Sequence, residues 1–184
     1  MANWYNEQLT NKNFLSPIGF VFVLDKARRT SFLCQRAEIP AINLGAVQIP
    51  TRGMVPIPTE GNMTYGNLNI DFLVDEDLRN YMELHNWIRA LGTPQDYQER
   101  RDWVDKYSIG MGKSPDTKTS DATLQVLNNN NIVNFDVVFK DLFPVSLSTV
   151  NFDVTQDDNN YFTATAEFEY VLYEVRNKNS QTRR

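Results

Sequence analysis

Residues 162–170 alternate between apolar and polar side chains without a break. This two-residue period belongs to a β-strand, in which successive side chains point to opposite faces. The apolar face must enter a core, so the segment requires a sheet with one buried face. The apolar face holds Phe162, Ala164, Ala166, Phe168, Tyr170 and Leu172, and the polar face holds Thr163, Thr165, Glu167 and Glu169.

Further strands are indicated in both halves of the chain. In the C-terminal third, ATLQVL, IVNFDVVFK and LFPVSLSTVNFDV are strand-like, and the turn-forming stretches NNNN and QDDNN bound them. Near the N-terminus, IGFVFVL (18–24) is apolar on both faces, which favours a place inside a sheet or an assembly. A polar connection joins it to SFLCQRAEI (31–39), and the two segments are predicted to form a hairpin.

The spacing of apolar residues within 67–92 changes from that of a strand to that of a helix. Residues 68–74 alternate as a strand does, and from Leu78 the apolar residues take helical spacing, which predicts a helix at 77–91. The expected packing face of this helix is Leu78, Tyr81, Leu84, Ile88 and Leu91. Between the strand and the helix lies Asp75-Glu76-Asp77, and we interpret these acids as helix caps that accept N–H bonds and complement the helix dipole.

Two segments lack a sustained period. Residues 40–63 contain four prolines and three glycines among isolated apolar residues, which indicates a strand edge followed by a projecting loop. Met54, Val55 and Ile57 are its candidates for contact with another subunit, and a flexible loop in solvent is the alternative. Residues 93–121 form a long polar insertion, part of which has the apolar spacing of a short second helix.

The simplest packing of these elements is a mainly β fold. We expect one domain over residues 1–184, a β-barrel or sandwich of two packed, mostly antiparallel sheets with one flanking α-helix. Residues 1–15 are expected to form an N-terminal arm and residues 176–184 a C-terminal tail.

The sequence offers little for chemistry. Cys34 is the only cysteine and His85 the only histidine, which leaves no zinc site rich in Cys or His, and both side chains are expected to pack. Residues 153–160 resemble a calcium loop in composition but lack its Gly and terminal Glu, so a turn is favoured. Without a phosphate-binding Gly-rich loop or a nucleophile motif, we predict no catalytic, cofactor or metal site and no enzyme activity.

Charge and hydropathy limit the partners. The net charge of −5 disfavours standing affinity for DNA phosphates, which Lys and Arg must neutralise. No apolar run reaches the length of a membrane span, and the first residues, MANWYNEQLTNKNF, lack the regions of a signal peptide. We therefore expect a soluble protein that does not bind membranes and is not exported by that route.

The order of several segments resembles a known family. FLCQRAEIP, a Pro- and Gly-containing stretch, TYGNLNIDFLVDEDLRNYMELHNWI, VVFKDLFPVSLSTVNFD and a long last strand together resemble the tail tube proteins of contractile-tailed bacteriophages. The tube protein of type VI secretion is a more distant likeness. Residues 93–121 have no counterpart in this pattern.

This resemblance implies a structural virion protein that carries out no catalysis. It implies two packed sheets with a side helix, and hexameric rings that stack into a hollow tail tube conducting DNA into the host. The implied partners are further copies of the chain, the tail sheath protein, the tape measure protein, and the baseplate and tail terminator proteins. Assembly in the host cytoplasm and a final place in the virion tail follow from the same resemblance.

Other interpretations stay open at this point. A baseplate protein of the same fold that initiates the tube is one, and a type VI secretion-like tube protein is a second. A third is a carbohydrate-binding β-sandwich, which requires exposed Trp and Tyr on one concave face. Within the tube interpretation, Thr163, Thr165, Glu167 and Glu169 are candidates for the channel wall, because six copies of each Glu would form a ring of negative charge.

Overall fold

The computed structural model describes residues 14–50, 52–53, 55–93, 96–108, 118–153 and 161–177. Its strands are β1 (Phe20–Leu24), β2 (Cys34–Ala37), β3 (Ile42–Ile49), β4 (Ile57–Tyr65), β5 (Leu68–Leu73), β6 (Ser120–Leu127), β7 (Val133–Leu147), β8 (Thr163–Glu169) and β9 (Leu172–Asn177). Its helices are α1 (Arg28–Phe32), α2 (Arg79–Gly92) and α3 (Tyr97–Ser108). The prediction of a mainly β fold with a flanking helix is confirmed, and α1 and α3 add to it.

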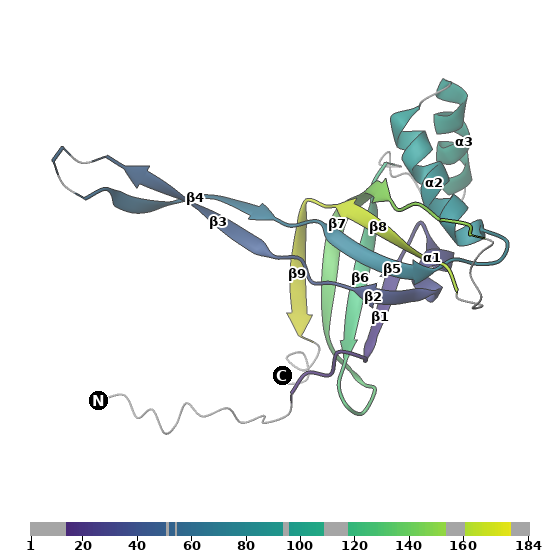
Figure 1. The fold of residues 1–184 in the computed structure, drawn as a ribbon, viewed down its shortest axis with the longest axis horizontal. Coiled ribbons are helices and arrows are strands. Elements are labelled where there is room, and N and C mark those ends of the chain that lie inside the picture. Colours follow the sequence, from purple (N-terminus) through teal and green to yellow (C-terminus); the bar gives the residue numbers. More distant parts are fainter. Residues whose placement is uncertain are drawn as a thin grey trace.

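Strand β7 belongs to both layers of the body. It pairs along one side with β6, and along its other side first with β9 and then with β8, all antiparallel. Strands β8, β5 and β2 continue from there, so the main sheet has the order β1-β6-β7-β8-β5-β2. Figure 1 shows β2, β5 and β8 running across the direction of β1, β6 and β7, which makes two layers.

The point where β7 changes partner carries an unusual backbone conformation. Asp141 has a φ of 54°, in the left-handed region that Asp adopts more readily than most residues. Its neighbour Lys140 still pairs with β9, and Phe143 already pairs with β8. The sequence predicted a strand ending at residue 140 and another from 142, whereas the chain passes through Asp141 as one strand.

The core lies between the two layers and under α2. The alternation predicted for β5 and for residues 163–169 is confirmed, because every second side chain of β5 and β8 is buried. The prediction that one long strand carries this face to Leu172 is wrong, because Phe162 is 41% exposed and Leu172 belongs to β9, which pairs with β7. The fully buried side chains include Leu68, Ile70, Phe72, Val137, Phe139, Leu142, Ala166 and Phe168 from the strands and Leu84 and Trp87 from α2.

The predicted hairpin of the first two segments is wrong. β1 pairs with β6, and β2 pairs with β5 in the other layer. Helix α1 occupies part of the connection that the sequence suggested was only a polar turn. The chain crosses from one layer to the other between Leu24 and Cys34, and the buried Ala27 and Thr30 anchor this crossing.

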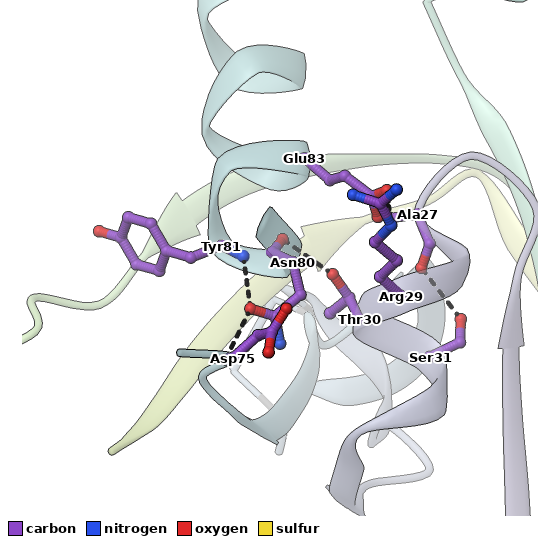
Figure 2. Close-up of polar contacts among 8 residues, drawn as sticks. All are labelled: Ala27, Arg29, Thr30, Ser31, Asp75, Asn80, Tyr81 and Glu83. Atoms are coloured by element: carbon purple, nitrogen blue, oxygen red, sulfur yellow. Dashed lines mark hydrogen bonds and ion pairs between the residues drawn. The ribbon is translucent and has the colours of Figure 1, made fainter. Parts of the chain in front are cut away.

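The acidic residues before α2 do not cap it. The residue at the helix start is Leu78, in a left-handed conformation with φ 59°, and no side chain bonds to the helix start as a cap. Asn80 takes over the polar contacts instead, as Figure 2 shows: its Oδ1 accepts the backbone N–H of Asp75 and of Tyr81, at 3.1 and 2.8 Å. The cap interpretation of Asp75-Glu76-Asp77 is therefore wrong, and Asp77 forms an ion pair with Arg79 on the surface.

Asn80 also ties together three parts of the chain. Its Nδ2 donates to the backbone carbonyl of Leu73 at the end of β5. Its backbone carbonyl accepts a hydrogen bond from the hydroxyl of Thr30 in α1 at 3.1 Å. The side chains of Asn80 and Thr30 are completely buried. A buried amide is stable only when its donors and acceptors have partners, so this residue fixes how β5, α1 and α2 meet.

Helix α2 packs through a face that the sequence identified in part. Leu84 is fully buried as expected, but the centre of the face is Trp87 with Ala90, whereas Ile88 is only half-buried. Part of the polar insertion 93–121 is helix α3, and its Trp103 ring stacks on Trp87 at a centroid distance of 6.0 Å. The two helices therefore form one unit at the end of the body (Figure 1).

Residues 42–65 form a β-hairpin where a strand edge and a loop were predicted. We call this hairpin, made of β3 and β4, the arm; Figure 1 shows it extending far from the body. Pro58 lies within β4, opposite Gln48. A two-stranded ribbon tolerates proline because each strand has an outer edge on which no ladder donor is needed.

A cluster of tyrosines holds the root of the arm. The hydroxyl of Tyr170 donates to the carbonyl of Gly66 at 2.9 Å, and that of Tyr173 donates to the carbonyl of Pro40 at 3.2 Å. The ring of Tyr65, the last residue of β4, lies 6.0 and 5.5 Å from these two rings. The two chain segments at the base of the arm are thus bound by Tyr170, in the turn between β8 and β9, and by Tyr173, in β9.

Replacing Asn80 by Ala is expected to destabilise the fold strongly. The change leaves two N–H groups and one carbonyl without their partner, and each buried orphan costs about 1–3 kcal/mol. We expect the free energy of unfolding, measured by urea denaturation, to fall by about 3 kcal/mol or more. Asp77→Ala is the control, with a change within about 0.5 kcal/mol; a larger loss there would restore the cap interpretation.

Tyr170 is expected to make stability depend on pH in the alkaline range. Burial, followed by repulsion from ionised Tyr173 and Tyr65, raises the pKa of Tyr170 to about 12 from an ordinary value of 10.0. Between those values the folded chain keeps a proton that the unfolded chain has lost, so the free energy of unfolding falls as pH rises through that window.

Urea unfolding across the same alkaline range tests this for the wild type, Tyr170→Phe and a matched control. Tyr170→Phe should weaken the alkaline loss of stability, whereas Tyr161→Phe, at a tyrosine that is 85% exposed, should leave it unchanged. Equal pH profiles for the wild type and Tyr170→Phe would show that this hydroxyl does not titrate with folding.

Candidate assembly surfaces

The arm exposes apolar side chains along its whole length. All eight residues of β3 are exposed, and so are most of β4. Among the predicted contact residues, Val55 is 85% and Ile57 57% exposed, and Met54 lies outside the described residues. Contact of these residues with another subunit stays a prediction, but their place on a projecting arm suits it.

A second apolar surface lies on the body beside α1. Val21 and Val23 of β1 and Phe32 of α1 are exposed, with Phe32 at 88%, and they line a groove of about 440 Å³ with Phe20 and Cys34. Among the described strands, β1 is at the end of the main sheet, with β6 as its only neighbour. The apolar segment 18–24 therefore lies at an edge of the sheet and not inside it, and burial inside an assembly, the other place that its composition favoured, stays a prediction.

The polar side of β8 forms a hydrogen-bonded surface with β5. Thr163, Thr165 and Glu169 are exposed, and Glu167 is half-buried. The hydroxyl of Thr165 donates to Asp71 at 2.7 Å. Asn67 Nδ2 donates to Glu167 Oε1 at 2.8 Å.

The charges on this surface are mostly negative. Asp71, Glu167 and Glu169 contribute carboxylates, and the Arg36 guanidinium lies 3.9 Å from Asp71. The structure thus keeps the four predicted channel residues together on one side of one strand. Whether this side faces a channel stays a prediction.

The remaining reactive side chains are Cys34, which packs against the core, and His85. Burial raises the pKa of Cys34 to about 11, so the sulfur is a thiol at neutral pH, and it lies 3.3 Å from the carbonyl of Arg36. His85 is half-buried on α2. Within the described residues, no group of three or more His, Cys, Asp or Glu is placed to hold a metal ion, and none of the helices there has the length and apolar character to cross a membrane.

The carbohydrate-binding alternative requires exposed Trp and Tyr on one concave face, and two of the tryptophans are buried. Trp87 and Trp103 are buried against each other between α2 and α3. Three tyrosines, Tyr65, Tyr170 and Tyr173, are occupied in the cluster at the root of the arm. The two tryptophan rings therefore serve the packing of the subunit, and the three half-buried tyrosine rings hold the root of the arm.

Solved structures with a similar fold are parts of the anti-feeding prophage and of an extracellular contractile injection system. The tube-terminating cap of the anti-feeding prophage matches with a TM-score of 0.61 and 13% identity, covering 96% of this chain and 99% of the other. A chain of the PVC sheath–tube complex in the extended state matches with a TM-score of 0.58 and 11% identity, covering 90% and 93%. A chain of the anti-feeding prophage baseplate matches with a TM-score of 0.54 and 12% identity, covering 86% and 91%.

The sequence itself matches a family model. No curated protein sequence shows a significant match to the chain. The model of the phage tail tube protein family, in contrast, matches residues 12–176, which is nearly the whole chain. The chain therefore belongs to the phage tail tube protein family, whose members are structural proteins of the tail.

Proposed function

We propose that this chain is the repeating subunit of a hollow tail tube, assembled from stacked hexameric rings that conduct DNA. The observation that carries the proposal is the arm, whose strands extend beyond the body and expose their apolar side chains, with no cover from the described residues of their own subunit. An isolated two-stranded hairpin is at best marginally stable in water. A subunit of this shape is best explained by neighbours that cover the arm in the working assembly.

The position of the apolar surfaces supports a repeating assembly. The arm leaves one side of the body, and β1 with its groove lies at another edge (Figure 1). Two different surfaces that bind each other join copies head to tail, which generates closed rings or stacked filaments. This favours the repeating tube subunit over the alternative of a baseplate protein that only initiates the tube.

The β8 surface is the proposed channel wall. This surface carries the exposed carboxylate of Glu169 and the half-buried carboxylates of Glu167 and, from β5, Asp71. In a ring, each carboxylate repeats once per subunit, and the resulting negative field disfavours close binding of phosphates. Such a wall suits a conduit, because DNA passes along it without being held.

The proposed role is structural and uses no cofactor. The partners that follow are a sheath around the tube, a baseplate below it, a terminator above it and a tape measure protein inside it during assembly. The similar solved structures support this setting, since they come from a sheath–tube complex, a tube-terminating cap and a baseplate. The complete tail is then the place where the protein functions.

Electron microscopy and native mass spectrometry of the purified protein test the assembly. We expect hexamers in solution and hollow tubes at high concentration, because the uncovered apolar surfaces favour association. Single rings that never stack would favour the tube initiator. A species that stays monomeric at high concentration would overturn the proposal.

Reversing the charge of Glu169 tests the channel wall. Glu169→Lys changes an exposed residue of β8, so the subunit should fold and assemble as the wild type does. The assembled tubes should then retain DNA, with a retained fraction that falls as salt rises. Glu76→Lys, at an exposed position before α2, makes the same change in net charge and should retain none; equal retention by both variants would place Glu169 outside the channel.

A further inference from the structure

The pairing of β3 with β4 shifts by one residue in the middle of the arm. Near the body, Ile42 pairs with Tyr65 and Leu44 with Met63; nearer the tip, Val47 pairs with Thr59 and Ile49 with Ile57. Between these halves, Gly45 alone lies opposite Gly61 and Asn62, so β4 carries a bulge of one extra residue.

The apolar side chains change face at this bulge. Along β3, residues with even numbers share one face and residues with odd numbers share the other. In the half near the body the apolar residues are Ile42, Leu44 and Met63 on the even face of β3. In the half near the tip they are Val47, Ile49 and Ile57 on the odd face, and these six side chains are between 48% and 62% exposed.

The twist of the arm compensates for this change of face. In Figure 1, β4 lies above β3 near the body, and β3 lies above β4 near the tip. Two paired strands that exchange places in this way have turned over around their common axis, as expected for a two-stranded ribbon. The even face of the inner half and the odd face of the outer half therefore look toward the same side.

Glycine makes the close approach at the bulge possible. A Cβ added to Gly61 would lie 2.7 Å from the carbonyl oxygen of Gly45 and 3.1 Å from a methyl group of Val47. Real Cβ atoms do not approach a backbone oxygen so closely, so only glycine fits here without a shift of the backbone. The bulge is thus built into the sequence at the position where the apolar side chains change face.

From these observations we infer that the six apolar residues form one continuous stripe along one side of the arm, and that this stripe binds the β1–α1 groove of a second copy of the chain. The occupant is a copy because the body itself offers an exposed apolar surface of matching character at Val21, Val23 and Phe32. This inference rests on the proposed function, since a tube supplies the second copy.

The charges on the arm and around the groove are compatible with this contact. Among residues 42–65 the charged side chains are Arg52 at the tip and Glu60 on β4, and the groove is flanked by Asp25 and Arg28. Each surface carries one charge of each sign, so opposite charges are available at the rim of the contact and no large repulsion opposes it. A nucleic acid, in contrast, would find no basic surface on the arm.

Single Asp substitutions on opposite faces test the stripe. Leu44→Asp and Val47→Asp place a charge in the stripe and should reduce tube formation at least about tenfold, which corresponds to 1.4 kcal/mol. Asn43→Asp and Gln48→Asp are the matched controls on the reverse side and should assemble normally. All four positions are exposed in the subunit, so circular dichroism should show a folded protein in every case.

The sensitive positions should thus be even-numbered near the body and odd-numbered near the tip. If Asp at Leu44 or Gln48 reduces tube formation and Asp at Val47 does not, the arm binds through one flat face, and the inference of a stripe is overturned. Tolerance at all four positions would overturn it as well.

Disulfide trapping tests the groove as the partner surface, in a Cys34→Ser background. With an added oxidant to accept the two electrons, Val47→Cys combined with Val23→Cys should form a disulfide between copies, and Gln48→Cys combined with Val23→Cys should not. If tubes form but the first pair of cysteines does not cross-link, the groove is not the partner surface, and the proposal of a tube still stands. If the protein makes no tubes, the tube proposal fails, and the cross-link in concentrated solution still decides whether the arm binds the groove.

Discussion

The rest of the body depends on the continuity of β7. Because this strand bonds to β6 along one side and to β9 and then β8 along the other, it holds both layers of the body in one hydrogen-bonded sheet. The left-handed residue Asp141 lies where the second partner changes, and the two layers diverge there. Side chains from both layers, including Phe139 and Phe168, then close over a shared core.

Buried polar contacts position the parts that the sheet does not hold. Asn80 fixes the start of α2 against β5 and α1, and the hydroxyls of Tyr170 and Tyr173 fix the two chain segments at the root of the arm. In both places the backbone leaves regular structure and would otherwise bury groups without partners. Directional bonds of this kind set the orientation of an element, which apolar packing alone does not do.

The described part of the subunit leaves apolar surfaces exposed at its extremities. The arm and the β1–α1 groove are exposed apolar surfaces, and the polar side of β8 is a mostly negative surface. In the proposed function the first two serve assembly and the third lines the path of DNA. Apolar contact is suited to holding copies together, and a negatively charged wall is suited to letting a polyanion pass.

The sequence alone determined the strands and the helix whose apolar residues recur with a clear local period. The alternation in β8 and β5, the helical spacing after Leu78 and the scarcity of Cys and His were enough to predict a mainly β structural protein, and the order of segments was enough for the family. These features are local, so they can be recognised without knowing which residues meet in space.

The tertiary structure decided which strands pair, what holds the start of α2 and how the arm is built. β1 pairs with β6 about a hundred residues away instead of with its neighbour in sequence, because the chain crosses between layers at α1. Asn80, and not the acidic residues before it, makes the polar contacts at the start of α2. The sequence could not predict this role, because only the fold shows that Asn80 is buried beside Leu73 and Thr30. The one-sided stripe of the arm likewise depends on strand register and twist, which exist only between paired strands.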